Sequence, residues 1–539
     1  MLYYFLHSML FVFWALWFQP GGIDLGLGFA VMVMVPLTVN LLIETNKQTP
    51  YITLLTRFKP WLVLFSIAGL LSLSLEHTIA ATVFSVLWLI ATIIVASFGF
   101  FRLSLQGFRD AEEVLLFVGC LYLAIGGGWF VLSALEAGRF LSYSQTIIDL
   151  TAIHFHYSAF VLPIVAGMFG RWLKQINVNM AGFASLAAGL LAGPFLVAIG
   201  IEVGPPLEPI LVLIYIWFVI WFALAAIRYS FLLKGLNKYS LLVAMAILIG
   251  TMVLSYLYSA GLAWAPQRLS IPDMVRYHGM ANVFGFALLS IIVWLSVKPK
   301  QKVAEHKFPN HSIRGRAFIQ DRLFTHLPLI PKKELIEDWG AYRHEQFNPD
   351  LVKPAIRSFH EQTSQYHLEA NISWHRPFTF VLPLILRITK HMKQLYLPPG
   401  LVAMKGDTYE YSEEQTTVWV RKHADSHAPI LTAYYSSWLA EKRYNFIQLP
   451  LPIGVMSAVL LPLNDEKDGL YLVGNRYYRF TGVYVSLWKW TWKTPLREMF
   501  HLIEDEDGLK AIHTISVFRK NMLTIQYHIY RAEKQDYVR

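Results

Sequence analysis

Long apolar runs recur through the first 300 residues and leave this part of the chain few ways to fold. Each run reaches the roughly 20 residues that a helix needs to cross the hydrocarbon core of a bilayer. Charge is scarce there, since residues 1–300 hold 15 of the 46 Lys and Arg and 11 of the 36 Asp and Glu. We therefore expect an all-α polytopic membrane bundle of about ten transmembrane helices in residues 1–298. The expected spans are residues 2–18, 23–43, 56–75, 79–101, 113–134, 150–170, 180–201, 209–233, 240–263 and 274–297.

Positive charge in the connections between these runs predicts how the bundle is oriented. The even-numbered connections hold ten Lys and Arg, whereas the odd-numbered connections hold three. Short cytoplasmic loops carry an excess of Lys and Arg, so the even connections are expected in the cytoplasm. The first run has no basic stretch before it and no small-residue cleavage site, which is typical of a retained span. The prediction is a multi-pass protein of the cell membrane with its N-terminus outside and its C-terminal half in the cytoplasm.

The composition changes after residue 298, where charged residues become frequent and long apolar runs end. Residues 299–349 have the mixed character of a linker with short helices. From residue 350 on, apolar and polar residues alternate, which is typical of strands with one buried face. Turn signals such as "NDEKDG" at residues 464–469 separate these stretches and predict hairpins. We expect residues 350–539 to form an α+β cytoplasmic domain, with a largely antiparallel sheet of about seven or eight strands and at least one helix packed on it.

The expected sheet contains aromatic residues that can line one of its faces. The stretch "VSLWKWTW" at residues 485–492 reads as one strand with Trp488, Trp490 and Trp492 on a single face. A curved sheet with an aromatic concave face can hold an apolar ligand such as a lipid, but the same residues can also form an ordinary core. A third interpretation places the tryptophans at the membrane surface, where this residue type is enriched. All three interpretations stay open from the sequence.

The net charge of +10 does not indicate a nucleic-acid partner, because no basic run or nucleic-acid-binding motif accompanies it. We attribute the excess of positive charge to contact with the membrane surface. The single cysteine, Cys120, excludes an intrachain disulfide and any metal site that needs several cysteines. The expected partners are therefore the lipid bilayer and a small-molecule or lipid ligand, and no nucleic acid.

Three histidines at the start of two spans are the polar residues that most need an explanation. "HFHYSAF" at residues 154–160 opens the sixth span, and "HGMANVFGFAL" at residues 278–288 lies at the start of the tenth. The predicted topology places both starts at the outer face. Ionisable residues inside a membrane are costly and are read as functional by default. We therefore predict a substrate or proton site near the outer leaflet, made from His154, His156, Tyr157, Ser158, Glu202, Glu208, His278, Gly279 and Asn282.

Helix geometry limits how these side chains can cooperate. Residues three and four apart share a face, so His154 is aligned with Tyr157 and Ser158. His156 points about 200° around the helix from His154, so both reach one small site only where the helix is unwound. Pro163 should kink the same span.

Three classes of function are compatible with such a site. The first is a transporter or another protein that handles a small molecule or lipid, with a cytoplasmic domain that regulates it or binds a ligand. The second is a membrane enzyme in which His154, His156 and His278 hold a metal or a haem. The third is a membrane sensor that signals to its cytoplasmic domain. Neither a metal nor a haem is strongly indicated, and no helix-borne HExxH zinc motif is present.

In combination, the two histidine motifs in a polytopic N-terminal half resemble the YndJ-like family of bacterial membrane proteins. The resemblance extends over most of the chain, including "IRSFHEQTSQY" at residues 356–366. It implies that His154, His156, Tyr157, His278, Gly279 and Asn282 belong to family motifs. It implies no role for these residues, although members of the family are sometimes labelled transporters.

Overall fold

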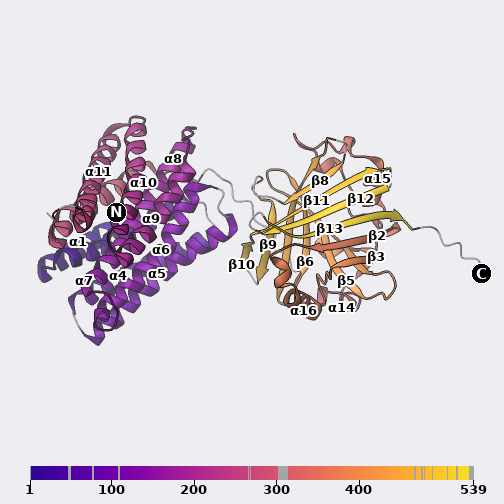
Figure 1. The fold of residues 1–539 in the computed structure, drawn as a ribbon, viewed down its shortest axis with the longest axis horizontal. Helices are drawn as coiled ribbons and strands as arrows, with labels where there is room; N and C mark the ends of the chain where they lie inside the picture. Colours follow the sequence, from indigo (N-terminus) through magenta and orange to yellow (C-terminus); the bar gives the residue numbers. More distant parts are fainter. Residues whose placement is uncertain are drawn as a thin grey trace, which may run out of the picture. The chain divides into compact units, whose positions relative to one another are not determined.

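The computed structural model divides the chain into two compact units, Met1–Glu305 and His306–Arg539. The first unit is built from helices and the second mainly from strands (Figure 1). The described residues are 2–46, 50–75, 78–106, 110–264, 266, 269–301, 313–466, 469–474, 478, 480–487, 490–506, 508–517 and 520–532.

Nine helical segments in the described part of the first unit are long and apolar enough to cross a membrane. They match the second to tenth predicted spans, whereas the first predicted span is a shorter apolar helix of 17 residues. Many large apolar side chains point outward from the bundle, as Trp217 does at 66% exposure, and this surface suits lipid rather than water. The segments are α1 (Leu2–Phe18), α2–η1–α3 (Gly22–Phe29, Ala30–Met34, Val35–Thr45), α4 (Pro50–Ser74), α5 (Ile79–Gln106), α6 (Ala111–Ala134), α7–η3–α8 (Gln145–His156, Tyr157–Val161, Leu162–Gln175), α9 (Phe183–Val203), α10 (Leu207–Ser230), α11 (Gly235–Ala263) and α12–η4–η5–α13 (Ile271–Asp273, Met274–Gly279, Ala281–Ala287, Leu288–Val297).

Three spans contain π-helical turns in place of a regular α-helix, in η1, η3 and the pair η4–η5. A proline follows two of these turns, Pro36 after η1 and Pro163 after η3. Proline has no N–H to donate, and its ring crowds the carbonyl one turn earlier, so the preceding turn widens. The predicted kink at Pro163 is therefore taken up as a π-helical turn.

Pro36 leaves the Met32 carbonyl without its usual hydrogen-bond donor, and a side chain from another helix supplies one. In a regular helix the N–H of residue 36 would bond to Met32 O, and proline cannot supply it. The His7 Nδ1–H of α1 donates to that carbonyl at 2.8 Å, from a side chain that is 2% exposed. The short first helix is thus fixed to the second span by a specific polar contact.

This arrangement predicts an interaction between substitutions at two distant positions. His7→Phe should lower the free energy of unfolding by about 1–3 kcal/mol, because Met32 O is left unsatisfied in an apolar bundle. In a Pro36→Ala background the restored N–H can bond to Met32 O, so the same substitution should cost less than half as much. Unfolding of the detergent-solubilised chain measures both, and equal costs in the two backgrounds would contradict the assignment.

The second unit differs from the expected α+β domain, because its sheet closes into a barrel. All pairings among its described strands are antiparallel, and the order β7-β6-β5-β4-β3-β2-β13-β12-β11-β8 returns to its start through the β7–β8 pair. The sheet thus has more strands than the seven or eight predicted, and ten of them form the barrel (Figure 1). The strands are β1 (Leu329–Pro331), β2 (Tyr366–Trp374), β3 (Gly400–Tyr411), β4 (Thr416–His423), β5 (Pro429–Leu439), β6 (Arg443–Pro450), β7 (Gly454–Asn464), β8 (Leu470–Gly474), β9 (Gly482–Leu487), β10 (Trp490–Lys493), β11 (Leu496–Asp505), β12 (Gly508–Val517) and β13 (Lys520–Arg531).

The barrel interior is an apolar core with one helix packed on it. Ile356 and Phe359 of α15 (Pro354–Glu361) belong to the same buried cluster as the inward residues of the strands. Two further helices, α14 (Asp321–His326) and α16 (Leu382–Met392), complete the unit. Residues of the expected linker also join the barrel, because Leu329–Pro331 pair with β3. Helical and strand elements are therefore both present, but the strands dominate.

The expected single strand over residues 485–492 is wrong. The chain reverses there, so that Leu487 of β9 pairs with Trp490 of β10. Trp488 lies outside the described residues, as does the side chain of Trp490. Because β9 and β10 pair antiparallel instead of continuing as one strand, the three tryptophans no longer share a face by simple alternation.

Candidate functional site

Both histidine motifs lie deeper in their spans than the sequence indicates. The sixth span begins at Gln145, where the Ser144 hydroxyl accepts a bond from Ile147 N, and not near residue 150. His154 is therefore nine residues, or roughly 14 Å, from the start of its helix. The tenth span begins at Ile271, so that His278 is roughly 10 Å in.

The helix runs through both histidines of the sixth span, so they point in different directions as predicted. His154 is exposed, and its Nδ1–H donates to Leu150 O at 2.6 Å. His156 is fully buried, its Nδ1–H donates to Ala152 O at 2.8 Å, and its Nε2 accepts from Trp88 Nε1 at 3.1 Å. Both ring nitrogens of His156 are therefore occupied, and its neutral tautomer is fixed by packing partners.

His278 is half-buried and belongs to a polar cluster between the ninth and tenth spans. Its Nδ1–H donates to Thr251 O at 2.9 Å. Asn282 Nδ2 donates to His278 O at 2.9 Å, and the Thr251 hydroxyl donates to Asn282 Oδ1 at 3.0 Å. Gly279 lies in the same π-helical turn, where an added Cβ would meet only Met274 O at 3.7 Å, so packing alone does not require a glycine.

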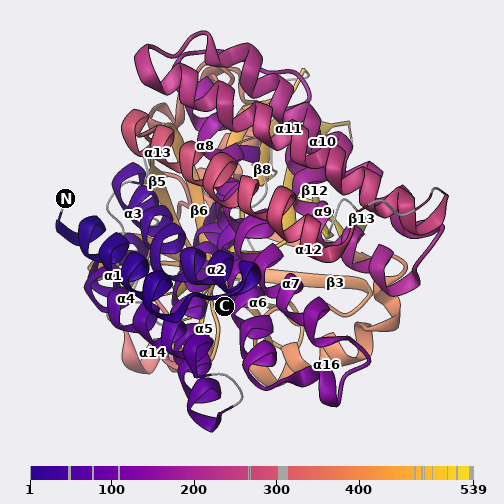
Figure 2. The same ribbon diagram turned by 90° about the vertical axis from the view of Figure 1, so that its left-hand side faces the viewer.

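The structure brings His154 and His278 together, although 124 residues separate them. They lie on spans that contact each other, because η3, which begins three residues after His154, contacts η5, which begins three residues after His278. The second span completes the cluster, because the Tyr157 hydroxyl donates to Gly26 O at 2.8 Å and an added Cβ on Gly26 would collide with Ile153. Figure 2 shows α2 beside α7, and α2 contacts both α7 and η4. All three spans with π-helical turns therefore meet here.

The remaining predicted site residues make contacts elsewhere. Ser158 shares a hydrogen bond of 2.8 Å with the Tyr215 hydroxyl of α10. Glu202 accepts from the Tyr143 hydroxyl at 2.6 Å, and Glu208 lies over Gly200 at the start of α10. Within the ranges that the structure describes, neither carboxylate contacts a histidine of the predicted site.

The interpretation as a zinc or similar metal-ion site gains no support from this geometry. No group of three or more His, Cys, Asp or Glu that could hold a metal ion occurs among the described residues. His156 could become a ligand only by giving up the bond from Trp88. His154 and His278 alone supply two nitrogens, and a zinc site needs three or four ligands.

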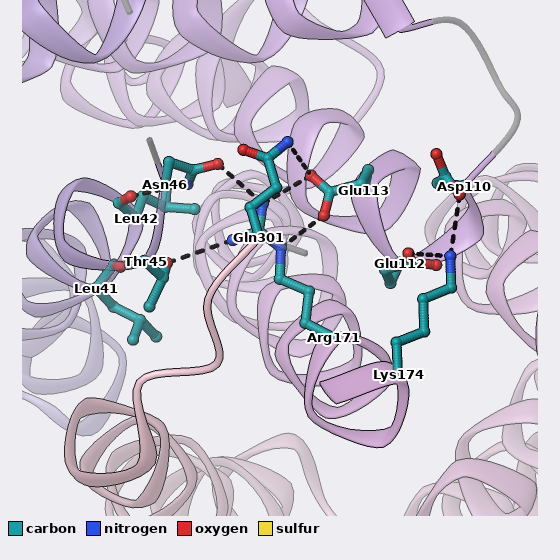
Figure 3. A network of polar contacts seen from close by, with 10 residues as sticks. All are labelled: Leu41, Leu42, Thr45, Asn46, Asp110, Glu112, Glu113, Arg171, Lys174 and Gln301. Carbon is teal, nitrogen blue, oxygen red and sulfur yellow. Dashed lines mark hydrogen bonds and ion pairs between the residues drawn. The ribbon is translucent and has the colours of Figure 1, made fainter. Parts of the chain in front are cut away.

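A second polar cluster lies at the opposite ends of the spans, and sequence reasoning missed it. Arg171 of α8 donates to both carboxylate oxygens of Glu113 in α6, from Nε at 2.7 Å and from Nη2 at 2.6 Å. The two side chains are 2% and 7% exposed. The guanidinium also donates to Asn46 Oδ1 at 2.9 Å and to the Thr45 hydroxyl at 3.4 Å (Figure 3). In the sequence, Arg171 is a charge in a connection and Glu113 is the first residue of an expected span, so nothing there indicates that the two pair.

This ion-pair cluster also includes the segment that leaves the last span. Gln301 N donates to Thr45 O at 3.1 Å, and its side-chain amide donates to Glu113 at 3.5 Å (Figure 3). Beside the cluster, the more exposed Lys174 pairs with Asp110 at 2.9 Å and also with Glu112. The ends of α3, α8 and α13 and the start of α6 meet here, all of which the predicted topology places on one side.

Comparison with known proteins agrees with the resemblance seen in the sequence. Residues 25–286 match the family described as YndJ-like protein. The chain is 28% identical over 461 residues to the "Uncharacterized membrane protein YndJ" of Bacillus subtilis (strain 168), covering 83% of each chain. That alignment is longer than the membrane half, so it includes part of the barrel unit. No solved structure matches the chain.

Proposed function

Because the chain is an integral membrane protein of the YndJ-like family, we propose that it handles an amphiphilic small molecule or lipid at His154 and His278. The observation that carries the proposal is that these two histidines lie beside or within π-helical turns of two spans that contact each other. π-Helical turns within α-helices are frequently located at functional sites. The two histidines and the turns beside them are called the histidine site below.

The hydrogen bonds of the histidine site indicate what it can bind. Each imidazole donates through Nδ1 to a backbone carbonyl, so its Nε2 carries a lone pair. Neither Nε2 has a hydrogen-bond partner within the described ranges. An exposed polar group this far into an apolar span is costly unless a polar partner meets it. The matching ligand is an amphiphile that presents a hydroxyl or an ammonium group at this depth.

Analysis of the lipids that copurify with the protein tests the proposal. His154→Leu/His278→Leu should reduce the amount of a hydroxyl- or amine-bearing amphiphile by about tenfold. The variant removes two hydrogen bonds to the ligand, and two hydrogen bonds between neutral groups contribute about that much together. Asn237→Ala is the matched control, since Asn237 bonds to Ser296 near the other end of the tenth span. Identical lipids in the double variant and the wild type would overturn the proposal, provided that both unfold at the same temperature.

We also propose the orientation that the charge pattern predicts, with the N-terminus outside and the barrel unit in the cytoplasm. The ion-pair cluster is then on the cytoplasmic side and the histidine site lies toward the outer side. A protease added to intact cells should leave a tag after Arg539 uncut and should cut it once the cells are permeabilised. Cleavage of the tag in intact cells would reverse the assignment.

A sensor is the second candidate, and the ion-pair cluster favours it. Lys298 pairs with Glu44 at 2.7 Å, and Gln301 bonds to both Thr45 and Glu113. The chain that continues to the barrel unit is thus bonded to the second and fifth spans as it leaves the tenth. A rearrangement of those spans would move this segment, which is the connection that a sensor needs.

A further inference from the structure

The barrel encloses a small cavity that the proposed function does not use. Its volume is about 60 Å³, and its lining is mostly apolar. Polar groups reach it from β4, β5, β6, β13 and α15, namely Arg421, Tyr435, Asn445, Tyr527 and His360. The cavity therefore combines an apolar wall with a few polar groups, as is typical of sites for small molecules.

Arg421 is the group in this cavity that most needs a partner. It is 8% exposed, and its guanidinium lies 3.8 Å from the centre of the Trp419 ring. Nη2 donates to the Tyr435 hydroxyl at 3.1 Å, and the Tyr527 hydroxyl also interacts with the guanidinium. The buried Nε has no hydrogen-bond partner. A buried cation therefore has only neutral partners and one unused donor.

Nearby charges do not neutralise Arg421. No carboxylate in the described ranges forms an ion pair with it, and Glu498, whose charge acts on Tyr435, accepts from His513 at 2.7 Å. Burial lowers the pKa of His360 to about 4, so this second basic residue is neutral at pH 7. Among the residues that line the cavity, Arg421 alone is positively charged at neutral pH. A buried charge without a counter-ion is costly, and a bound anion would remove that cost.

We propose that the barrel binds a small apolar carboxylic acid, with its carboxylate on Arg421 and on the hydroxyls of Tyr435 and Tyr527. The planar edge of a guanidinium matches a carboxylate, which can accept from Nε and Nη2 together. The apolar wall accommodates the hydrocarbon part of the acid. The cavity is small, so the acid is a short one. A long acyl chain would enter only if α15 moved.

Binding of short acids to the full-length protein in detergent tests the proposal. Butyrate is the probe, butyramide is its neutral counterpart of the same shape, and inorganic phosphate is the anion without an apolar part. Calorimetry should show butyrate binding at least about tenfold more tightly than butyramide, since hydrogen bonds to a charged group contribute more than neutral ones. Phosphate should bind weakly or not at all. Octanoate should bind more weakly than butyrate if the cavity keeps its size.

Substitutions separate a binding role of Arg421 from a structural one. Arg421→Gln should abolish the preference for butyrate over butyramide. Tyr435→Phe and Tyr527→Phe keep the rings in place and should each weaken butyrate several-fold while leaving butyramide unchanged, which guards against misfolding of the arginine variant. Equal affinity for butyrate and butyramide, or no binding of butyrate at millimolar concentration, would overturn the proposal.

Discussion

Arg171→Ala should lower the free energy of unfolding by about 3–5 kcal/mol, which is the effect of removing one partner from a buried ion pair. The loss is large because Glu113 would keep its charge at 7% exposure without the two bonds that Arg171 donates. The same substitution removes the donors to Thr45 and Asn46 at the end of the second span. Chemical or thermal unfolding of the solubilised chain gives the measurement.

Two further variants distinguish this buried pair from surface charge. Arg171→Met/Glu113→Leu removes both charges and should recover most of the loss, because a well-packed apolar pair often equals a buried ion pair in stability. Lys174→Ala breaks the neighbouring contacts of a side chain that is 47% exposed, so it should cost about 0–1 kcal/mol. A large cost for Lys174→Ala, or a double variant as unstable as Arg171→Ala, would mean that the network does not stabilise the bundle through its buried charges.

The sequence predicted the membrane half well, because a transmembrane helix is a local feature. About 20 apolar residues form one whatever the rest of the chain does, and nine of the ten predicted spans match long helices in the described residues. The interruptions were harder to predict. Pro163 indicated a kink, but the π-helical turns of the tenth span have no proline after them, so no comparable signal marks them in the sequence.

The barrel was not predictable in the same way, because closure depends on pairing between distant strands. β8 must pair with both β7 and β11, and nothing in its five residues indicates the second partner. β4 was hard to predict for a different reason. Its first six residues are buried on both faces, since Ile313 and Leu323 pack over its outer side, so the alternation of apolar and polar residues disappears.

The polar contacts of the bundle could be predicted only in part. Histidines in apolar runs were visible as unusual residues, and two of them meet at the histidine site. The sequence did not indicate which ring nitrogens of these histidines already have a hydrogen-bond partner within the bundle. His7 and His156 are both packed against specific backbone or side-chain partners, whereas the exposed His154 has its Nε2 available.

His154 and His156 differ in burial, so substitutions at the two positions should have very different effects on stability. His156→Ala should lower the free energy of unfolding by about 2–5 kcal/mol, because it leaves a cavity at a fully buried position beside Trp88 and Phe130. His154→Ala should change it by less than about 0.5 kcal/mol, as is usual for an exposed side chain. Unfolding in mixed micelles measures both.

Trp88→Phe tests whether the hydrogen bond to His156 contributes beyond packing. Combined with His156→Leu, the tryptophan substitution should cost about 0.6–2 kcal/mol less than it does alone, the range found for hydrogen bonds between membrane helices. Strict additivity would mean that the bond of 3.1 Å contributes nothing. If His156→Ala is unstable while His154→Leu/His278→Leu is stable but loses its amphiphile, two histidines of one motif have separate roles. His156 would then fix the sixth span against α5, so that the opposite side of the same helical turn can present His154 to its ligand.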